Sequence, residues 1–294
     1  MKTNITNTLG KASFIFALSS FLFISCDQQE VESFDSQKDT PITIASASVA
    51  ELTTRVITEE GHLIGAVDEN ASMSVFVTGG SNAKYNADNV KWVHDGECWR
   101  ANSQTLFEGT NSKQKICALS PYREDATLED GVTITADGVT DYLVAASTPV
   151  TSNSVSLTMT HALTKLVLNA TLGTELEGET ITEVKVVNMY ASGTLNVSDN
   201  SWSNLSEAGA SLVMRNNEIL VIPMASCESF PVVITMESGR VFSANISLAN
   251  VDNKLEGGTQ YTIKLQIGHD TVTIGDISAA SWGTPISGGN LETE

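Results

Sequence analysis

The sequence predicts an all-β protein made of two tandem antiparallel β-sandwiches, and three observations lead to this prediction. Turn dipeptides such as Asp95-Gly96 and Ser238-Gly239 separate runs of β-branched and aromatic residues, which is a strong local signal for hairpins. No segment keeps a helical period for more than about three turns. Glycine and acidic residues interrupt two apolar strands over residues 173–179, which places a boundary between two domains there.

Strand pairs are predicted around four turns, at Asp95-Gly96, Asp137-Gly138, Asn216-Asn217 and Ser238-Gly239. The residues at these tips tolerate a positive φ, and the runs on either side have strand composition. Further strands are predicted at residues 74–78, 155–160, 163–171, 181–190, 194–197, 261–268 and 271–274.

The N-terminus has the pattern of an export signal. Lys2 and Lys11 flank a polar start, and residues 12–24 form an uncharged apolar run that is too short to span a bilayer. Cys26 follows the small residue Ser25 at the end of this run, as in a bacterial lipobox, so we expect acyl chains on Cys26 that anchor the mature chain to a membrane. The alternative is ordinary cleavage near Ser25, which would leave Cys26 a free thiol.

The composition is that of a folded, acidic protein. Hydrophobic residues make up 41% of the 294 residues, and 35 acidic against 16 basic residues give a net charge of −19. Removing residues 1–25 takes away two lysines and no acid, so the mature balance is 14 minus 35, or −21. Because the chain is acidic and has no run of basic residues, a nucleic acid is not an expected partner.

The segment after Cys26 divides into a tether and a first strand. Residues 27–40 are acidic and polar, as in a spacer that holds a folded body away from a membrane. Residues 41–55 have the short, β-branched character of an extended strand.

Three cysteines remain beyond Cys26, and none of them forms a CxxC pair. We expect Cys98, Cys117 and Cys227 to be small core residues, with a Cys98–Cys117 bridge as the alternative.

The inventory of catalytic motifs is thin, so the sequence predicts neither an enzyme nor a cofactor. There is no P-loop, HExxH, GxSxG, dinucleotide-binding or EF-hand pattern. His94 lies close to Asp95, Glu97 and Cys98, but the turn at Asp95-Gly96 accounts for these residues without a metal, and we expect no metal site.

Four tryptophans offer an alternative to a purely structural role, because such rings can stack on sugars. Tryptophans beside hairpin turns are more often core or cross-strand partners, and we interpret these four in that way. They are Trp92, Trp99, Trp202 and Trp282.

The order of several short motifs resembles the fimbrillin family, the Mfa-like and FimA-like pilus subunits of Gram-negative anaerobes. VSLTMTHALTKL at residues 155–166 is the closest match to a strand pair of that family. The other matching segments are TTRV at 53–56, MSVFV at 73–77, NVKW at 89–92, ICALSPY at 116–122, DYLVA at 141–145, IP at 222–223, GTQYTI at 258–263, and Ile277 with Trp282. The pattern departs from the family at residues 59–65 and at Met224.

The resemblance implies two transthyretin-like sandwiches, lipoprotein export, and cleavage after an arginine that frees a first strand. The vacated groove would then accept a strand from another subunit. Arg55, directly before Val56, stands at the matching place, and the candidate donor is residues 271–286 with Val272, Ile274, Ile277 and Trp282. Alternatively, Arg55 is an ordinary strand-end arginine and the C-terminal run an ordinary last strand.

The resulting division has a lipoprotein signal peptide at 1–25, a tether and propeptide strand at 26–55, an N-terminal sandwich at 56–173 and a C-terminal sandwich at 174–294. The expected function is a structural pilus subunit at the surface of the outer membrane that supports adhesion. Its expected partners are other pilus subunits or copies of itself and the outer membrane through the lipid anchor, with a host or bacterial surface receptor as a candidate. The alternative function is a monomeric surface lipoprotein that binds a glycan or another ligand.

Overall fold

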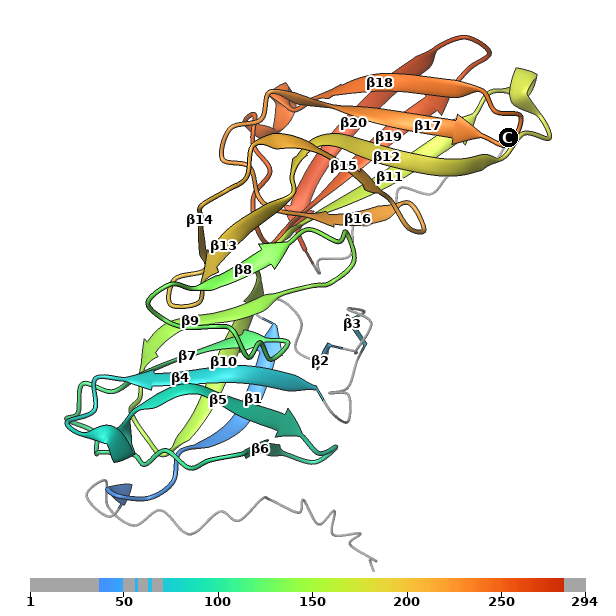
Figure 1. Ribbon diagram of the computed structural model, residues 1–294. Helices are drawn as coiled ribbons and strands as arrows, with labels where there is room; N and C mark the ends of the chain where they lie inside the picture. The colour runs from blue at the N-terminus through green and yellow to red at the C-terminus, as the bar shows by residue number, and fades with distance from the viewer. Residues whose placement is uncertain (1–36, 50–55, 58–62, 65–70, 283–294) are drawn as a thin grey trace, which may run out of the picture. The chain divides into compact units, whose positions relative to one another are not determined.

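The computed structural model describes residues 37–49, 56–57, 63–64 and 71–282, and these residues are almost entirely β-structure (Figure 1). The all-β prediction is confirmed. Helix within these ranges consists of short 3-10 turns, which include η2 (Ala83–Tyr85), η3 (Thr174–Leu176) and η4 (Ala249–Val251). None of the helices found there has the length and apolar character that a membrane crossing requires.

The first half of the chain forms a seven-stranded sheet, with β1 at one edge and β6 at the other. In spatial order its strands are β1 (Thr43–Val49), β10 (Ser154–His161), β9 (Leu143–Pro149), β7 (Lys115–Ser120), β4 (Ser72–Thr78), β5 (Ala87–His94) and β6 (Trp99–Ala101). Residues Val56–Ile57 (β2) and Leu63–Ile64 (β3) form a separate short pair.

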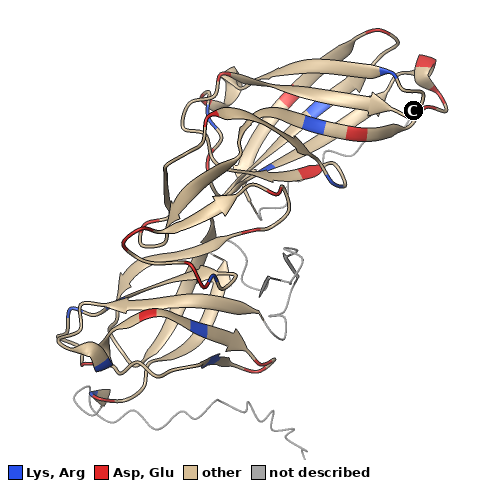
Figure 2. Ribbon diagram, viewed as in Figure 1, with Lys and Arg blue, Asp and Glu red and all other residues tan. Residues whose placement is uncertain are grey.

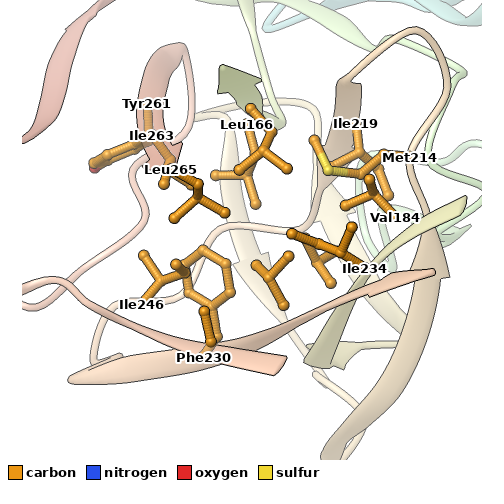
Figure 3. Close-up of a cluster of buried hydrophobic side chains, with 14 of the residues drawn as sticks. Leu166, Val184, Met214, Ile219, Phe230, Ile234, Ile246, Tyr261, Ile263 and Leu265 are labelled. Carbon is orange, nitrogen blue, oxygen red and sulfur yellow. The ribbon is translucent and has the colours of Figure 1, made fainter. Parts of the chain in front are cut away.

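The second half forms two four-stranded sheets whose inner faces share one core. The first sheet contains β16 (Glu218–Val221), β11 (Thr164–Leu172), β19 (Thr259–Ile267) and β20 (Val272–Ser281). The second contains β15 (Ala208–Val213), β12 (Ile181–Tyr190), β17 (Ser229–Met236) and β18 (Val241–Ser247). Figure 3 shows side chains of both sheets meeting in this core, with Leu166, Ile263 and Leu265 from the first and Val184, Phe230 and Ile234 from the second.

A three-stranded sheet takes strands from both sides of the predicted boundary at 173–174. It consists of β14 (Ser201–Ser203), β13 (Ser192–Asn196) and β8 (Val132–Thr135). The buried cluster around it is likewise shared, because it joins Phe76 and Leu119 of the first half to Leu220, Ile222 and Trp282 of the second. The boundary therefore stays a prediction, since burial runs continuously across it.

Two neighbouring strand pairs run parallel within an otherwise antiparallel structure. β1 is parallel to β10, and β11 is parallel to β19. The sequence predicts antiparallel pairs alone, because parallel pairs usually need helical crossovers. Here several further strands, of the same sheet and of others, lie in the chain between the paired strands, which allows parallel neighbours without helices.

Two of the four predicted hairpins are confirmed and two are wrong. The turns at Asp95-Gly96 and Ser238-Gly239 join the paired strands β5–β6 and β17–β18. The turn at Asn216-Asn217 forms with both φ values positive, but β15 and β16 then join different sheets after a single bridge. Likewise β8 pairs with β13 and not with the residues after Asp137-Gly138. The residues of a turn determine whether the chain bends there. Which strands then pair depends on the core in which each strand is buried.

Two of the three described cysteines, Cys117 and Cys227, are core residues as predicted, whereas Cys98 is not fully buried. Cys117 and Cys227 are buried free thiols, and Cys98 is half-buried, so the alternative Cys98–Cys117 bridge does not form. Burial raises the pKa of the Cys117 thiol to about 12.

Charged residues lie in turns and along the strands (Figure 2), and among the described Asp, Glu, Lys and Arg residues only Asp141 is buried. The strand β17 has a strict alternation of buried and half-buried residues, as expected for a strand with one face on a core. The acidic excess is therefore carried by the solvent-facing surface.

Phe230 tests the core of the second half. Its side chain is fully buried on β17, so Phe230→Ala leaves a cavity and should lower the free energy of unfolding by about 3 to 5 kcal/mol. Val241 on the adjacent strand β18 is 63% exposed, and Val241→Ala should change it by less than about 0.5 kcal/mol. Denaturant unfolding measures both, and equal small effects would show that Phe230 does not pack as described.

Candidate assembly site

The first strand, β1, is an edge strand held by a single neighbour. It pairs in parallel with β10, from Thr43 opposite Ser154 to Val49 opposite Met159, with a bulge between Ile44 and Ser46. Figure 1 shows β1 (blue) lying along β10. Without β1, the outer edge of β10 would present unpaired N–H and C=O groups.

Apolar side chains of β1 and the residue before it complete the core of the first half. Ile42, Ile44 and Val49 are buried and belong to the same cluster as Leu157 and Met159 of β10. Ala47 packs against this cluster and is half-buried. The same strand therefore supplies both backbone pairing and core side chains, and its removal would open an apolar groove along β10.

Residues just before β1 are tied down by polar contacts. The Ile42 amide donates to Thr105 O at 2.8 Å. Lys84 Nζ and the Tyr85 hydroxyl donate to Asp39 Oδ1 at 2.7 and 2.6 Å. These hydrogen bonds, first from Lys84 and then from Tyr85, hold the pKa of the Asp39 carboxyl below its usual range. Because the ion pair is solvent-exposed, burial of the isoleucines contributes more to holding β1 than this pair does.

The predicted lipidation and cleavage residues, Cys26 and Arg55, lie outside the described residues. Val56 is described only as the first residue of β2. Residues 50–55 provide the covalent connection from the end of β1 to Val56, so a cut after Arg55 would separate β1 from the remaining fold.

The predicted donor segment begins as the edge strand β20. It pairs with β19 from Val272 opposite Ile267 to Ser281 opposite Thr259, and its other edge is open within the sheet. Ile274 is 37% exposed, while Val272 and Ile277 are half-buried against the core of the second half. β20 thus contributes few side chains to the core on which it lies.

Trp282 differs from the other three predicted donor residues because it is buried. Its ring stacks on His161 with centroids 3.7 Å apart and an interplanar angle of 15°. The Trp282 amide donates to Gly258 O at 2.7 Å, and Gly258 adopts a positive φ that favours glycine. The C-terminal end of β20 is therefore anchored, whereas the middle of the strand is exposed.

His161 forms a buried pair with Asp141 beneath the Trp282 ring. Nδ1 of His161 lies 2.7 Å from Asp141 Oδ2, and both side chains are at most 2% exposed. His161 Nε2 and Asp141 Oδ1 have no hydrogen-bond partner among the described residues. We call the three residues that hold Trp282 in place, His161, Asp141 and Gly258, the Trp282 socket.

The socket was missed from the sequence, although each of its members lies in a segment already singled out. His161 is in VSLTMTHALTKL, Asp141 begins DYLVA and Gly258 begins GTQYTI. The signal was the presence of a histidine on the buried side of an alternating strand, together with an acid at the start of an apolar one. The sequence does not show that these two residues are partners, because their contact forms only when the end of β10 lies beside the start of β9.

The tryptophans do not form a common platform. Trp92 and Trp282 are buried, and the half-buried Trp99 and Trp202 pack against different clusters. Trp202 Nε1 donates to Ala162 O at 3.1 Å. These contacts match the interpretation of the rings as core and cross-strand partners.

The residues around His94 form a turn. The Asp95 carboxylate accepts from the amides of Glu97 and Cys98 and pairs with Arg100, which together lower its pKa. Within the described ranges, no group of three or more His, Cys, Asp or Glu side chains is placed to hold a metal ion.

Solved structures with a similar fold include two putative cell adhesion proteins and a fimbrial protein. A putative cell adhesion protein from Bacteroides uniformis ATCC 8492 has a TM-score of 0.64 and 18% identity, covering 83% of this chain and 99% of its own. One from Bacteroides ovatus ATCC 8483 has a TM-score of 0.61 and 16% identity, covering 83% and 98%. A fimbrial protein from Bacteroides vulgatus ATCC 8482 has a TM-score of 0.52 and 11% identity, covering 82% and 99%. No curated protein matches the sequence.

These likenesses establish the fold as one shared with adhesion and fimbrial proteins. A family model described as fimbrillin-like matches residues 54–282, which is more than half of the chain. The chain therefore belongs to the fimbrillin-like family, and the resemblance noted from its motifs is confirmed. The matched region ends at Trp282, the residue that closes the socket.

Ile44 tests how β1 is held. Ile44→Ala removes a buried side chain and should lower the free energy of unfolding by about 2 to 5 kcal/mol. Ser48→Ala, at an exposed position on the same strand, should change it by less than about 0.5 kcal/mol. Hydrogen exchange should show faster exchange of β10 amides in the first variant only. Unchanged β10 protection in Ile44→Ala would contradict this account.

Trp282 tests the anchoring of β20. Trp282→Ala should accelerate amide exchange across Val272–Ser281 by about tenfold or more, because loss of a buried aromatic ring costs several kcal/mol and opens the strand from its C-terminal end. Ile274→Ala, at an exposed position of the same strand, serves as the control and should leave this exchange nearly unchanged. Equal exchange in both variants would show that the socket does not hold the strand.

Proposed function

We propose that this protein is a structural subunit of a cell-surface pilus that assembles by donor-strand exchange after cleavage at Arg55. The observation that carries the proposal is the placement of β1, an edge strand that fills a core groove and continues into the segment containing Arg55. Family membership supports the pilus role. The partners are copies of the chain or other pilus subunits, and the assembled fibre supports adhesion.

Cleavage after Arg55 would change how β1 is retained. While the chain is intact, β1 is tethered next to its groove, so its local concentration is high and it rebinds rapidly. After the cut it is held by its pairing with β10, by the burial of Ile42, Ile44 and Val49, and by the hydrogen bonds of the residues just before it. A strand from another subunit then competes for the same backbone groups and the same apolar groove.

The donor in this proposal is the C-terminal strand β20 with the residues that follow it. β20 lies at an open sheet edge and most of its residues are exposed, so its detachment is opposed mainly by the buried Trp282 that follows it. It is joined to β19 by a short turn at residues 268–271, so it can swing out while its N-terminal end stays attached.

Export as a lipoprotein accounts for the N-terminal pattern. Acyl chains on Cys26 would hold the precursor at the outer membrane, since each buried methylene contributes about 0.8 kcal/mol. Cleavage at Arg55 would then separate the folded body from the segment that carries both the lipid anchor and β1. Lipid attachment and the opening of the groove are thereby linked by one cut.

The proposal is tested by treating the purified chain with an arginine-specific protease. The expected product lacks residues up to Arg55 and forms a ladder of multimers on gels run without boiling. Arg55→Lys keeps the charge but removes the cleavage site, so this variant should stay intact and monomeric. Arg215→Lys, at an exposed turn, should behave as the unmodified chain does.

Two outcomes would count against the proposal. A chain that is cut at Arg55 and remains monomeric would reject donor-strand assembly. Multimers that form equally well from Arg55→Lys would show that cleavage at this residue is not the trigger.

A further inference from the structure

The candidate donor strand is similar in sequence to the strand that it would replace. Residues 42–49 read ITIASASV and residues 272–279 read VTIGDISA. When the two segments are aligned without gaps, Thr43 matches Thr273, Ile44 matches Ile274, and Ser48 matches Ser278. Short segments can match by chance, so the structural positions of these residues decide whether the likeness has meaning.

The core-facing positions of the first segment and the positions aligned with them carry the same set of residue types in a different order, with an isoleucine shared at Ile44 and Ile274. In the first segment they lie at 42, 44, 47 and 49, where the chain has Ile, Ile, Ala and Val. The aligned positions 272, 274, 277 and 279 have Val, Ile, Ile and Ala. Each set contains two isoleucines, one valine and one alanine, so the total volume is unchanged. Cores tolerate exchanges that conserve volume far better than those that do not.

Both strands also carry a bulge at the same aligned position. β1 has its register shift between Ile44 and Ser46, around Ala45. β20 has its shift between Ile274 and Ile277, where Gly275 and Asp276 lie opposite the single residue Lys264. Ala45 aligns with Gly275. Since a bulge moves every later side chain relative to the partner strand, a shared bulge position preserves the match of the core-facing residues beyond it.

We propose that the groove along β10 receives β20 of a second copy of this chain, in the register of β1, with Val272 in the place of Ile42. This inference rests on the proposed function and adds the partner and the alignment. The incoming strand would run parallel to β10, with Ile274 opposite Val155, Ile277 opposite Leu157 and Ala279 opposite Met159, as the β1 register dictates. The partner is a second copy because the match is between two segments of one sequence.

The exchange increases the apolar burial of the donor strand. On its own body, β20 leaves Ile274 37% exposed and Val272 and Ile277 only half-buried. In the β10 groove, the position of Ile274 is that of Ile44, which is 3% exposed. The polar residues Asp276 and Ser278 would take the exposed positions of Ser46 and Ser48, so no charge is buried.

The same register brings the incoming Trp282 to the Trp282 socket. Counting on from Ala279 opposite Met159, Ser281 lies opposite His161, and Trp282 follows it. The acceptor's own Trp282 vacates this site when its β20 is donated onward. The incoming indole would then cover the buried pair of His161 and Asp141, which otherwise becomes exposed to water.

The register is tested by disulfide trapping between two variants. One carries Ser278→Cys and the other Thr158→Cys, both at exposed positions that the proposal places opposite each other. They are mixed, cleaved with the arginine-specific protease and oxidised. An intramolecular pair, Ser48→Cys with Thr158→Cys in one uncleaved chain, confirms that this geometry permits a bridge. Mixtures lacking either introduced cysteine correct for the native thiols.

We expect a cross-linked dimer that depends on cleavage and is about tenfold more abundant than the product of the off-register pair, Thr273→Cys with Thr158→Cys, because a slip would misplace every core side chain. Equal or preferred linking of the off-register pair overturns the proposal. So does the formation of multimers without the Ser278–Thr158 bridge, which leaves donor-strand assembly intact but with another register or another partner.

A peptide arm separates this inference from the proposed function. A synthetic peptide of residues 271–282 with Ser278→Cys is added to the cleaved Thr158→Cys chain. Cross-linking of this peptide, without multimers from the chain alone, supports the register and counts against the pilus role. Absence of both cross-linking and multimers overturns both proposals. A peptide with Ile274→Asp should link far less, because it would bury a charge at the position of Ile44.

Discussion

The pairing of β1 with β10 is the constraint on which the assembly account depends. A single edge strand provides the hydrogen-bond partner for β10 and also the last side chains of the first core. These two contributions cannot be separated, because loss of the strand leaves both an open sheet edge and an apolar groove. If cleavage at Arg55 removes this strand, as proposed, the first half is stable only when another strand occupies its position.

The second half provides a contrasting edge at β20. This strand completes its own sheet while leaving much of its surface in water, and it is secured mainly at Trp282. Opening the socket would hydrate the unpartnered His161 Nε2 and Asp141 Oδ1, which offsets part of the packing that is lost. The strand is thus held firmly enough to keep a monomer closed, yet its detachment disturbs only a small share of the core.

Sequence reasoning was most successful where local chemistry decides the structure. The strands around Asp95-Gly96 and Ser238-Gly239 pair as predicted, because a tight turn and alternating side chains fix both the bend and the buried face. It failed at Asn216-Asn217, where the turn forms but the flanking strands pack in different sheets. The parallel pairs join strands that are far apart in the sequence, and the contact of His161 with Asp141 depends on the register of β10 against β9; no local pattern reports either. The likeness of residues 42–49 to 272–279 is readable from the sequence, but it acquires meaning only when the core-facing positions and bulges are known.

The most direct measurement of the central claim is amide exchange along β10 in three states of the same chain: intact, cleaved at Arg55 under conditions that keep it dilute and monomeric, and assembled. The account predicts that Ser154–His161 is protected in the intact chain, becomes exposed after β1 leaves, and is protected again in the multimer. Protection that persists in the cleaved monomer after β1 has dissociated would show that β10 needs no replacement strand, and would contradict the account.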